Sequence, residues 1–170
     1  IPHVQKLNDK IFSLDERVTK VNAYMTDETA YVLFFNSEGT ISHDYRPMMS
    51  LGAVCIMERE GQLENSYTAR SFRKGFEFMT DDLIDEIANE SIARTSILFD
   101  ATKPKAGEMP VVMGAGGSGI LLHEAIGHTF EADFNRKGTS IFADKMGKHV
   151  AEKFVNIIDD GTLPGNRGSI

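Results

Sequence analysis

The most constraining segment of the sequence is the run at residues 120–128, which reads Ile-Leu-Leu-His-Glu-Ala-Ile-Gly-His. Its three leading aliphatic residues predict a mostly buried helix. Burying two imidazoles and a carboxylate in such a helix is unfavourable unless something pairs with them. A divalent cation bound by His123 and His128, with Glu124 beside it, would satisfy all three groups.

The two histidines lie five residues apart, and this spacing conflicts with regular helical geometry. In the H-E-x-x-H zinc signature the histidines are four apart, which offsets them by about 40° around a helix. A spacing of five gives about 140°, so a straight helix cannot direct both side chains to one ion. Gly127 directly precedes His128. We therefore predict a π-type turn or a helix break there, a distortion that is common at functional sites.

Zinc is the metal that this pattern favours, because imidazoles suit it and catalytic zinc sites usually combine three protein ligands with a water molecule. Glu124 would then lie beside the metal and act as a general base. The motif itself contains no third ligand. Glu131 and Asp133 are the nearby candidates, and either could instead hold an imidazole N–H. Arg136 is either a surface charge or a group that positions a peptide carboxylate.

The first hundred residues predict several β-strands. Polar and apolar residues alternate over residues 20–26, and a denser apolar run at 30–35 ends in the turn-like residues 36–39. We interpret these segments as a hairpin. Residues 48–57 are apolar on both faces, which predicts an interior strand that turns back into residues 63–72. Four or five antiparallel strands are expected.

A long helix should follow, capped by Thr80 and ending near Phe99. Its first turn is acidic, as the helix dipole favours, and an apolar stripe follows at helical spacing. Residues 103–108 then form a charged segment with Pro and Gly, which is typical of a linker. We take it as the boundary between a strand-rich α+β domain at residues 1–106 and the beginning of another domain at residues 107–170.

Beyond the linker, residues 109–113 predict a short buried strand and residues 114–119 a Gly-rich loop that leads into the histidine helix. The predicted fold class is therefore α+β: a mostly antiparallel sheet with a long packing helix, followed by a strand, a Gly loop and a metal-binding helix. The loop also matches the dinucleotide fingerprint G-x-G-x-x-G. However, the next expected strand, at residues 154–158, begins about 35 residues after the loop, whereas the fingerprint needs about 20.

Charge and cysteine content limit the partners and the cellular location that we expect for the protein. The sequence has 18 Lys and Arg against 25 Asp and Glu, and this net charge of −7 disfavours direct binding to nucleic acid. Cys55 is the only cysteine, so no intramolecular disulfide forms and a cytoplasmic location is expected. No apolar run approaches the roughly 18–20 residues that a membrane-spanning helix needs.

Several motifs together resemble the TldD branch of the TldD/PmbA metalloproteases, which also carry the label "modulator of DNA gyrase". They are Gly-Ala-Gly at 114–116, Leu-Leu-His-Glu-Ala-Ile-Gly-His at 121–128, Glu-Ala-Asp-Phe-Asn-Arg at 131–136, Gly-Thr-Ser at 138–140 and Asp-Asp-Gly-Thr at 159–162. The resemblance is strongest between residues 110 and 169 and weaker in the strand-rich part, where Asp-Tyr-Arg-Pro at 44–47 is also similar.

The resemblance implies a zinc peptidase of the H-E-x-x-x-H type, with His123 and His128 as ligands and Glu124 as the catalytic residue. In that family the third ligand is a cysteine in a later part of the C-terminal domain, and Cys55 does not match it. The sequence is thus identified as the middle domain and the start of the C-terminal domain, with an incomplete zinc site and no activity expected in isolation.

The resemblance also implies substrates and partners. Family members act on unstructured peptides, in peptide maturation or degradation, commonly beside a PmbA (TldE) subunit that lacks the metal motif. We expect such a partner or a homodimer, and an exposed strand edge would suit an extended peptide. The alternative from another class is a non-catalytic subunit that binds peptides, as the PmbA partner does, or nucleotides through the Gly loop.

Overall fold

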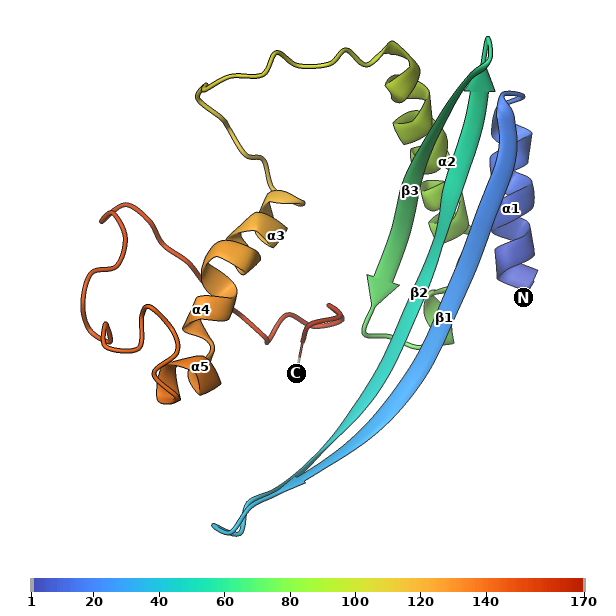
Figure 1. The fold of residues 1–170 in the computed structure, drawn as a ribbon. Helices are drawn as coiled ribbons and strands as arrows, with labels where there is room; N and C mark the ends of the chain where they lie inside the picture. The colour runs from blue at the N-terminus through green and yellow to red at the C-terminus, as the bar shows by residue number, and fades with distance from the viewer. Residues whose placement is uncertain (1, 170) are drawn as a thin grey trace. The chain divides into compact units, whose positions relative to one another are not determined.

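The computed structural model describes residues 2–169, and the contacts within it divide the chain into two units. The first unit holds the described residues up to Lys103 and from Asp160 onward, and the second is Pro104–Asp159. The first unit contains an antiparallel sheet with packed helices (Figure 1). The predicted α+β fold class is confirmed. No helix within residues 2–169 has the length and apolar character needed to cross a membrane.

The sheet has three strands in the order β1-β2-β3, namely β1 (Val18–Phe35), β2 (Ile41–Arg59) and β3 (Gln62–Phe72). The prediction of four or five strands is therefore wrong. The polar residues 26–29 do not end a strand, because they pair in register with residues 47–50 of β2. A β-ladder is held by main-chain groups, so polar side chains on an exposed stretch do not interrupt it.

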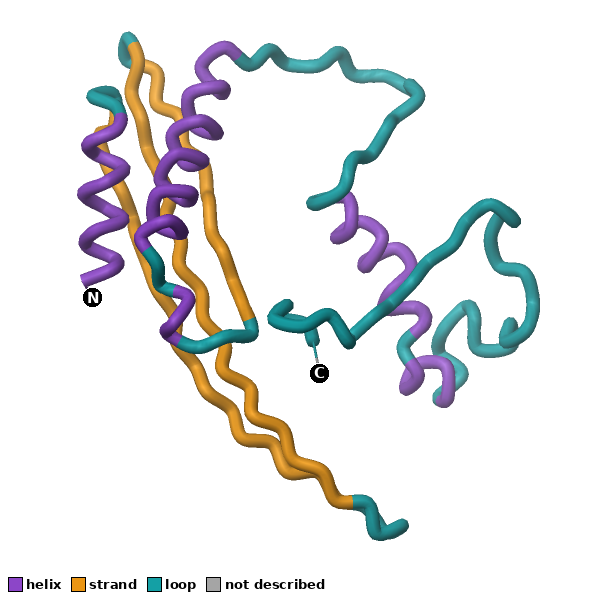
Figure 2. Tube along the Cα trace, turned by 180° about the vertical axis from the view of Figure 1, so that it is seen from behind, coloured by secondary structure: helices purple, strands orange, loops and turns teal. Residues whose placement is uncertain are grey.

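The helices α1 (Pro2–Leu14) and α2 (Asp81–Ser96) both lie over one face of the sheet (Figure 2). The predicted long helix is confirmed, and the short turn η2 (Ile97–Asp100) continues it. The Thr80 side chain accepts a hydrogen bond from the backbone N–H of Leu83 at 3.2 Å. A cap of this kind stabilises a helix by about 1 kcal/mol. Another short turn, η1 (Phe76–Phe78), precedes α2.

The core of the first unit lies between these helices and the covered face of the sheet. Its fully buried apolar residues come from α1, β2 and α2 and are Leu7, Ile11, Met49, Leu51, Ala53, Cys55, Met57, Ile84, Ile87 and Ala88. The predicted apolar stripe of the long helix is thus confirmed. Burial raises the pKa of the Cys55 thiol, so this side chain is a neutral core group.

The last part of the described chain, from Asp160 onward, belongs to the first unit and packs against its sheet. The backbone N–H of Arg73 donates to the carbonyl of Gly165 at 3.0 Å, and the Arg167 guanidinium donates to the Ser50 hydroxyl at 3.0 Å. Because Ser50 alternates with the core residues of β2, these bonds lie on the sheet face opposite the helices.

The second unit contains short helices joined by loops: α3 (Ser118–Leu122), η3 (His123–Gly127), α4 (His128–Phe130) and α5 (Ala132–Arg136). Residues 109–113 and 154–158 do not form the predicted strands. Both segments are exposed and no strand pairs with them in the described chain. Strands need a partner for their main-chain groups, and the second unit offers none.

The prediction of a mostly buried histidine helix is also wrong for these residues. Ile120, Leu121 and Leu122 are 67%, 57% and 44% exposed. No residue of the second unit is buried, because 56 residues of mostly loop present no second apolar layer to pack against.

Candidate metal centre

The helix that carries the histidines has the predicted distortion. Residues His123–Gly127 form a π-helical turn, η3, between α3 and α4. The backbone N–H of His128 donates to the carbonyl of His123, five residues back. A turn with this bonding brings residues five apart close to the same side of the helix. The prediction of a π-type turn is confirmed.

Gly127 leaves room for the imidazole of His123. Its backbone angles, φ −53° and ψ −56°, are helical and open to any L-residue. A Cβ atom at this position would lie 3.3 Å from Nδ1 of His123 and 3.7 Å from its Cγ. Glycine at this position therefore permits the close approach of a side chain, and no left-handed conformation is involved.

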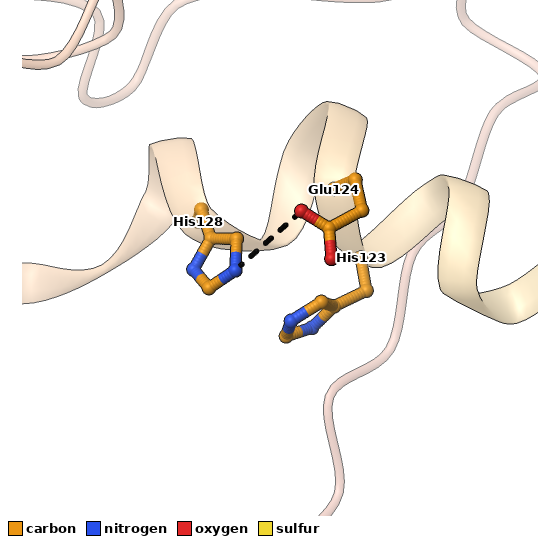
Figure 3. Close-up of side chains that lie close together, drawn as sticks. All are labelled: His123, Glu124 and His128. Carbon is orange, nitrogen blue, oxygen red and sulfur yellow. Dashed lines mark ion pairs between the residues drawn. The ribbon is translucent and has the colours of Figure 1, made fainter.

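The π turn brings three side chains together, as Figure 3 shows. His123, Glu124 and His128 each offer one ligand atom, and these atoms lie within 4.8 Å of one another. The two imidazole centroids are 4.4 Å apart, and Nε2 of His128 lies 3.8 Å from a carboxylate oxygen of Glu124. All three residues are exposed.

The donor set suits a divalent metal such as zinc. Two atoms bound to one zinc ion lie at most about 4.2 Å apart, given metal–ligand distances of about 2.1 Å. The observed limit of 4.8 Å is within a small side-chain rotation of that value. Two imidazoles beside a carboxylate are also the donor types that zinc peptidase sites use.

Glu131 fixes the orientation of His128. A carboxylate oxygen of Glu131 lies 2.7 Å from Nδ1 of His128. Because a carboxylate only accepts, Nδ1 carries the proton and donates it, which leaves Nε2 free on the side of Glu124. The hydrogen bond to Glu131 raises the pKa of His128, and the charges of Glu131 and Glu124 add to this effect against desolvation.

The other two residues singled out in the sequence lie apart from the cluster. Asp133 pairs with Lys137 at 3.1 Å. Arg136 lines another pocket of about 540 Å³, and the stacked rings of Phe130 and Phe142 also line it.

A second pocket, of about 410 Å³, adjoins the histidines. His123 lines it together with apolar side chains from the same helix, and Ile157 and Ile158 close it from a distant part of the sequence. Sequence reasoning missed these two isoleucines as pocket residues, because no local pattern connects them to a helix some 30 residues earlier.

A helix that presents two histidines and a glutamate to one point defines a candidate metallopeptidase. The family model described as "PmbA/TldA metallopeptidase central domain" matches residues 2–99, and the one described as "PmbA/TldA metallopeptidase C-terminal domain" matches residues 106–170. The chain belongs to this metallopeptidase family.

The names of similar proteins agree with this family assignment. The chain is 37% identical over 161 residues to "Metalloprotease TldD homolog" of Haemophilus influenzae, covering 92% of this chain and 33% of that protein. It is 38% identical over 165 residues to the protein of the same name from Buchnera aphidicola, covering 93% and 34%. It is 28% identical over 160 residues to "Zinc metalloprotease TldD homolog" of Saccharolobus solfataricus, covering 94% and 35%. The resemblance to the TldD branch is confirmed, and the chain spans about a third of the length of these relatives.

Proposed function

We propose that this chain carries the zinc-binding helix of a peptidase that hydrolyses unstructured peptides. His123 and His128 would hold the zinc ion, and Glu124 would act as the general base. The observation that supports this assignment is the convergence of the three side chains within 4.8 Å across a π turn. The family membership of the chain supports the reaction class.

When bound, zinc lowers the pKa of water and polarises a peptide carbonyl. Glu124 takes the proton from the attacking water and later delivers it to the leaving amine. General acid–base steps of this kind contribute about 10²- to 10⁴-fold to a rate. The carboxylate of Glu131 accepts a hydrogen bond from Nδ1–H of His128, so that Nε2 of the same ring stays available as a ligand atom.

The third zinc ligand would come from outside these residues. Glu131 is engaged by His128 and Asp133 by Lys137, and Cys55 is buried in the core of the first unit. We propose a cysteine from another part of the full-length protein, as the resemblance to the TldD branch implies. The pocket beside His123, which Glu131 and Asp159 line together with apolar side chains, would be one place for a substrate side chain.

The test uses the full-length protein with matched variants. Glu124→Gln should retain zinc and lose cleavage of an unstructured peptide, because it removes only the base. His123→Ala should lose both zinc and cleavage. Glu152→Gln, at an exposed carboxylate of the same unit, should keep both. Zinc content by elemental analysis and peptide cleavage by mass spectrometry give the readouts, and cleavage retained by Glu124→Gln would refute the assigned role.

No observation favours the alternative of a nucleotide-binding module. The dinucleotide fingerprint needs a strand before its Gly loop and a helix after it. Residues 109–113 do not form that strand. A non-catalytic peptide-binding subunit would differ in metal content, since it has no need of stoichiometric zinc. Cytoplasmic location and pairing with a PmbA-like subunit are further parts of the proposal.

A further inference from the structure

The pocket of about 540 Å³ that Arg136 lines is formed by two segments of the second unit. The helices α4 and α5 supply Phe130 and Arg136, and the loop that follows them supplies Phe142 and Lys148. We call this cavity the Arg136 pocket. Its volume lies in the range of sites that bind small ligands, which is about 300–1,000 Å³.

Side-chain hydrogen bonds hold the two segments together. The carbonyl of Thr129 accepts a bond from the side-chain amide of Asn135 at 3.0 Å and another from the Ser140 hydroxyl at 2.6 Å. The backbone N–H of Phe142 donates to the same Ser140 hydroxyl at 3.0 Å. The rings of Phe130 and Phe142 lie nearly parallel, with centroids 4.7 Å apart. Specific polar contacts thus place two stacked rings in the wall of the pocket.

The charged groups that line the Arg136 pocket are all cationic. They are Arg136, Lys145 and Lys148, and no Asp or Glu of the described chain lines this cavity. Lys145 pairs at 3.1 Å with Asp144, which is not a lining residue. Arg136 and Lys148 form no ion pair within residues 2–169. In a chain with a net charge of −7, this local excess of positive charge favours an anionic ligand.

The rings and the cations together define the chemistry of the ligand. A guanidinium is always charged and binds a carboxylate through two parallel hydrogen bonds. The stacked rings offer contact area to an apolar side chain. A carboxylate alone would leave the rings uncovered, and an apolar group alone would leave the cations without a partner. An acidic residue next to an apolar residue in one peptide supplies both groups.

The Arg136 pocket adjoins the pocket beside His123. Phe130 lines both cavities, and it follows the candidate ligand His128 by two residues. A peptide that lies across the candidate metal centre can therefore continue past Phe130 into the Arg136 pocket. The cavity is thus close enough to the centre to bind a residue near the cleaved bond.

We propose that the Arg136 pocket binds an acidic residue and its apolar neighbour in the peptide substrate, and that Arg136 and Lys148 hold the carboxylate. This inference rests on the proposed peptidase function. It narrows the substrate class from unstructured peptides in general to those with an acidic and apolar pair near the cleaved bond. The other occupants to be tested are the terminal carboxylate of a peptide and a further segment of the full-length protein.

The experiment measures peptide binding separately from cleavage. Full-length Glu124→Gln is titrated into fluorescent unstructured peptides that contain either a Glu-Leu or a Gln-Leu pair and have an amidated C-terminus. Fluorescence anisotropy gives the dissociation constants, and mass spectrometry checks that the peptides stay intact. The Glu-Leu peptide should bind at least about tenfold more tightly, because its carboxylate gains charge-assisted hydrogen bonds.

Two double variants of Glu124→Gln lose the same number of positive charges. Arg136→Gln with Lys148→Gln removes cations of the pocket and should bind the two peptides with dissociation constants within about twofold of each other. Lys137→Gln with Lys153→Gln removes two exposed cations that do not line the pocket, and it should keep the preference for Glu-Leu. Circular dichroism and zinc content check that both double variants keep the fold and the metal centre.

Equal binding of the Glu-Leu and Gln-Leu peptides would overturn the proposal. A preference that survives the loss of both pocket cations would overturn it too, and is expected if a further segment of the protein fills the cavity. So would an equal loss of preference in the two double variants, which indicates general charge attraction.

A Gln-Leu peptide with a free C-terminus supplies the last arm of the test. If it binds as tightly as the amidated Glu-Leu peptide, the cations recognise a terminal carboxylate and the proposal is wrong. Failure of the proposed function gives a different result. The wild-type protein would then lack zinc or cleave none of the peptides, whatever preference the binding measurements show.

Discussion

The substitution Gly127→Ala tests whether the π turn depends on a missing side chain. The added Cβ atom would lie 3.3 Å from Nδ1 of His123, closer than ordinary van der Waals contact. The imidazole has to move by a few tenths of an ångström to relieve this crowding. Metal–ligand distances tolerate only about 0.2 Å, so the displacement should weaken zinc binding.

The size of the effect follows from the torsional cost of moving His123. A side chain about 30° away from its rotamer costs about 0.5–1.5 kcal/mol, and a shift of a few tenths of an ångström needs a smaller rotation, so the loss of zinc affinity should not exceed roughly tenfold. Helix propensity acts in the opposite direction. Because Gly127 has helical backbone angles, alanine should favour the helix by up to about 1 kcal/mol. Zinc affinity should therefore fall although the metal-free protein is not destabilised.

The assay is chelator competition for zinc, together with thermal unfolding of the metal-free full-length protein. Gly119→Ala is the matched control, because Gly119 is also helical but a Cβ atom there would meet nothing within 4 Å. This control should retain zinc affinity. Unchanged affinity in Gly127→Ala, or an equal loss in both variants, would refute the crowding argument.

Two further substitutions test the same structural reasoning. Glu131→Gln should lower zinc affinity about tenfold, because it weakens the 2.7 Å hydrogen bond that orients His128, and chelator competition measures this. An unchanged affinity would mean that the ring needs no such support. Gly52→Ala should destabilise the first unit by about 1–3 kcal/mol, because its Cβ would lie 2.7 Å from Cβ of Ala69 and 2.8 Å from the carbonyl oxygen of Thr68. Denaturant unfolding of the full-length protein measures that loss, and full stability in the variant would contradict the close approach.

Features that depend on neighbouring residues could be predicted from the sequence. The capped helix after Thr80 follows from its cap, its acidic first turn and its apolar spacing, and α2 has all three. The π turn follows from a conflict between helical geometry and the five-residue spacing of two histidines, with Gly127 between them to allow the distortion. Both inferences use interactions within one or two helical turns.

Features that depend on residues distant in the sequence could not be predicted in the same way. The polar residues 26–29 suggested a break, but their place in β1 is decided by pairing with β2. The aliphatic residues before His123 suggested burial, but burial needs a second apolar layer, and a pattern of residues does not show whether one is present. The carboxylate of Glu131 was found as one of two alternatives, and only its 2.7 Å contact with His128 separates it from Asp133.

The two units differ in whether buried side chains hold them in place, and this difference bears on the candidate metal centre. The first unit has its own core, in which side chains such as Ile84 and Leu51 are fully buried. The second unit has no buried residue, so packing within it cannot lock the rotamers of His123 and Glu124. Catalytic metal sites need donors held to within a few tenths of an ångström. The helix therefore supplies the spacing of the donors through its π turn, whereas packing among the described residues does not supply their rigidity.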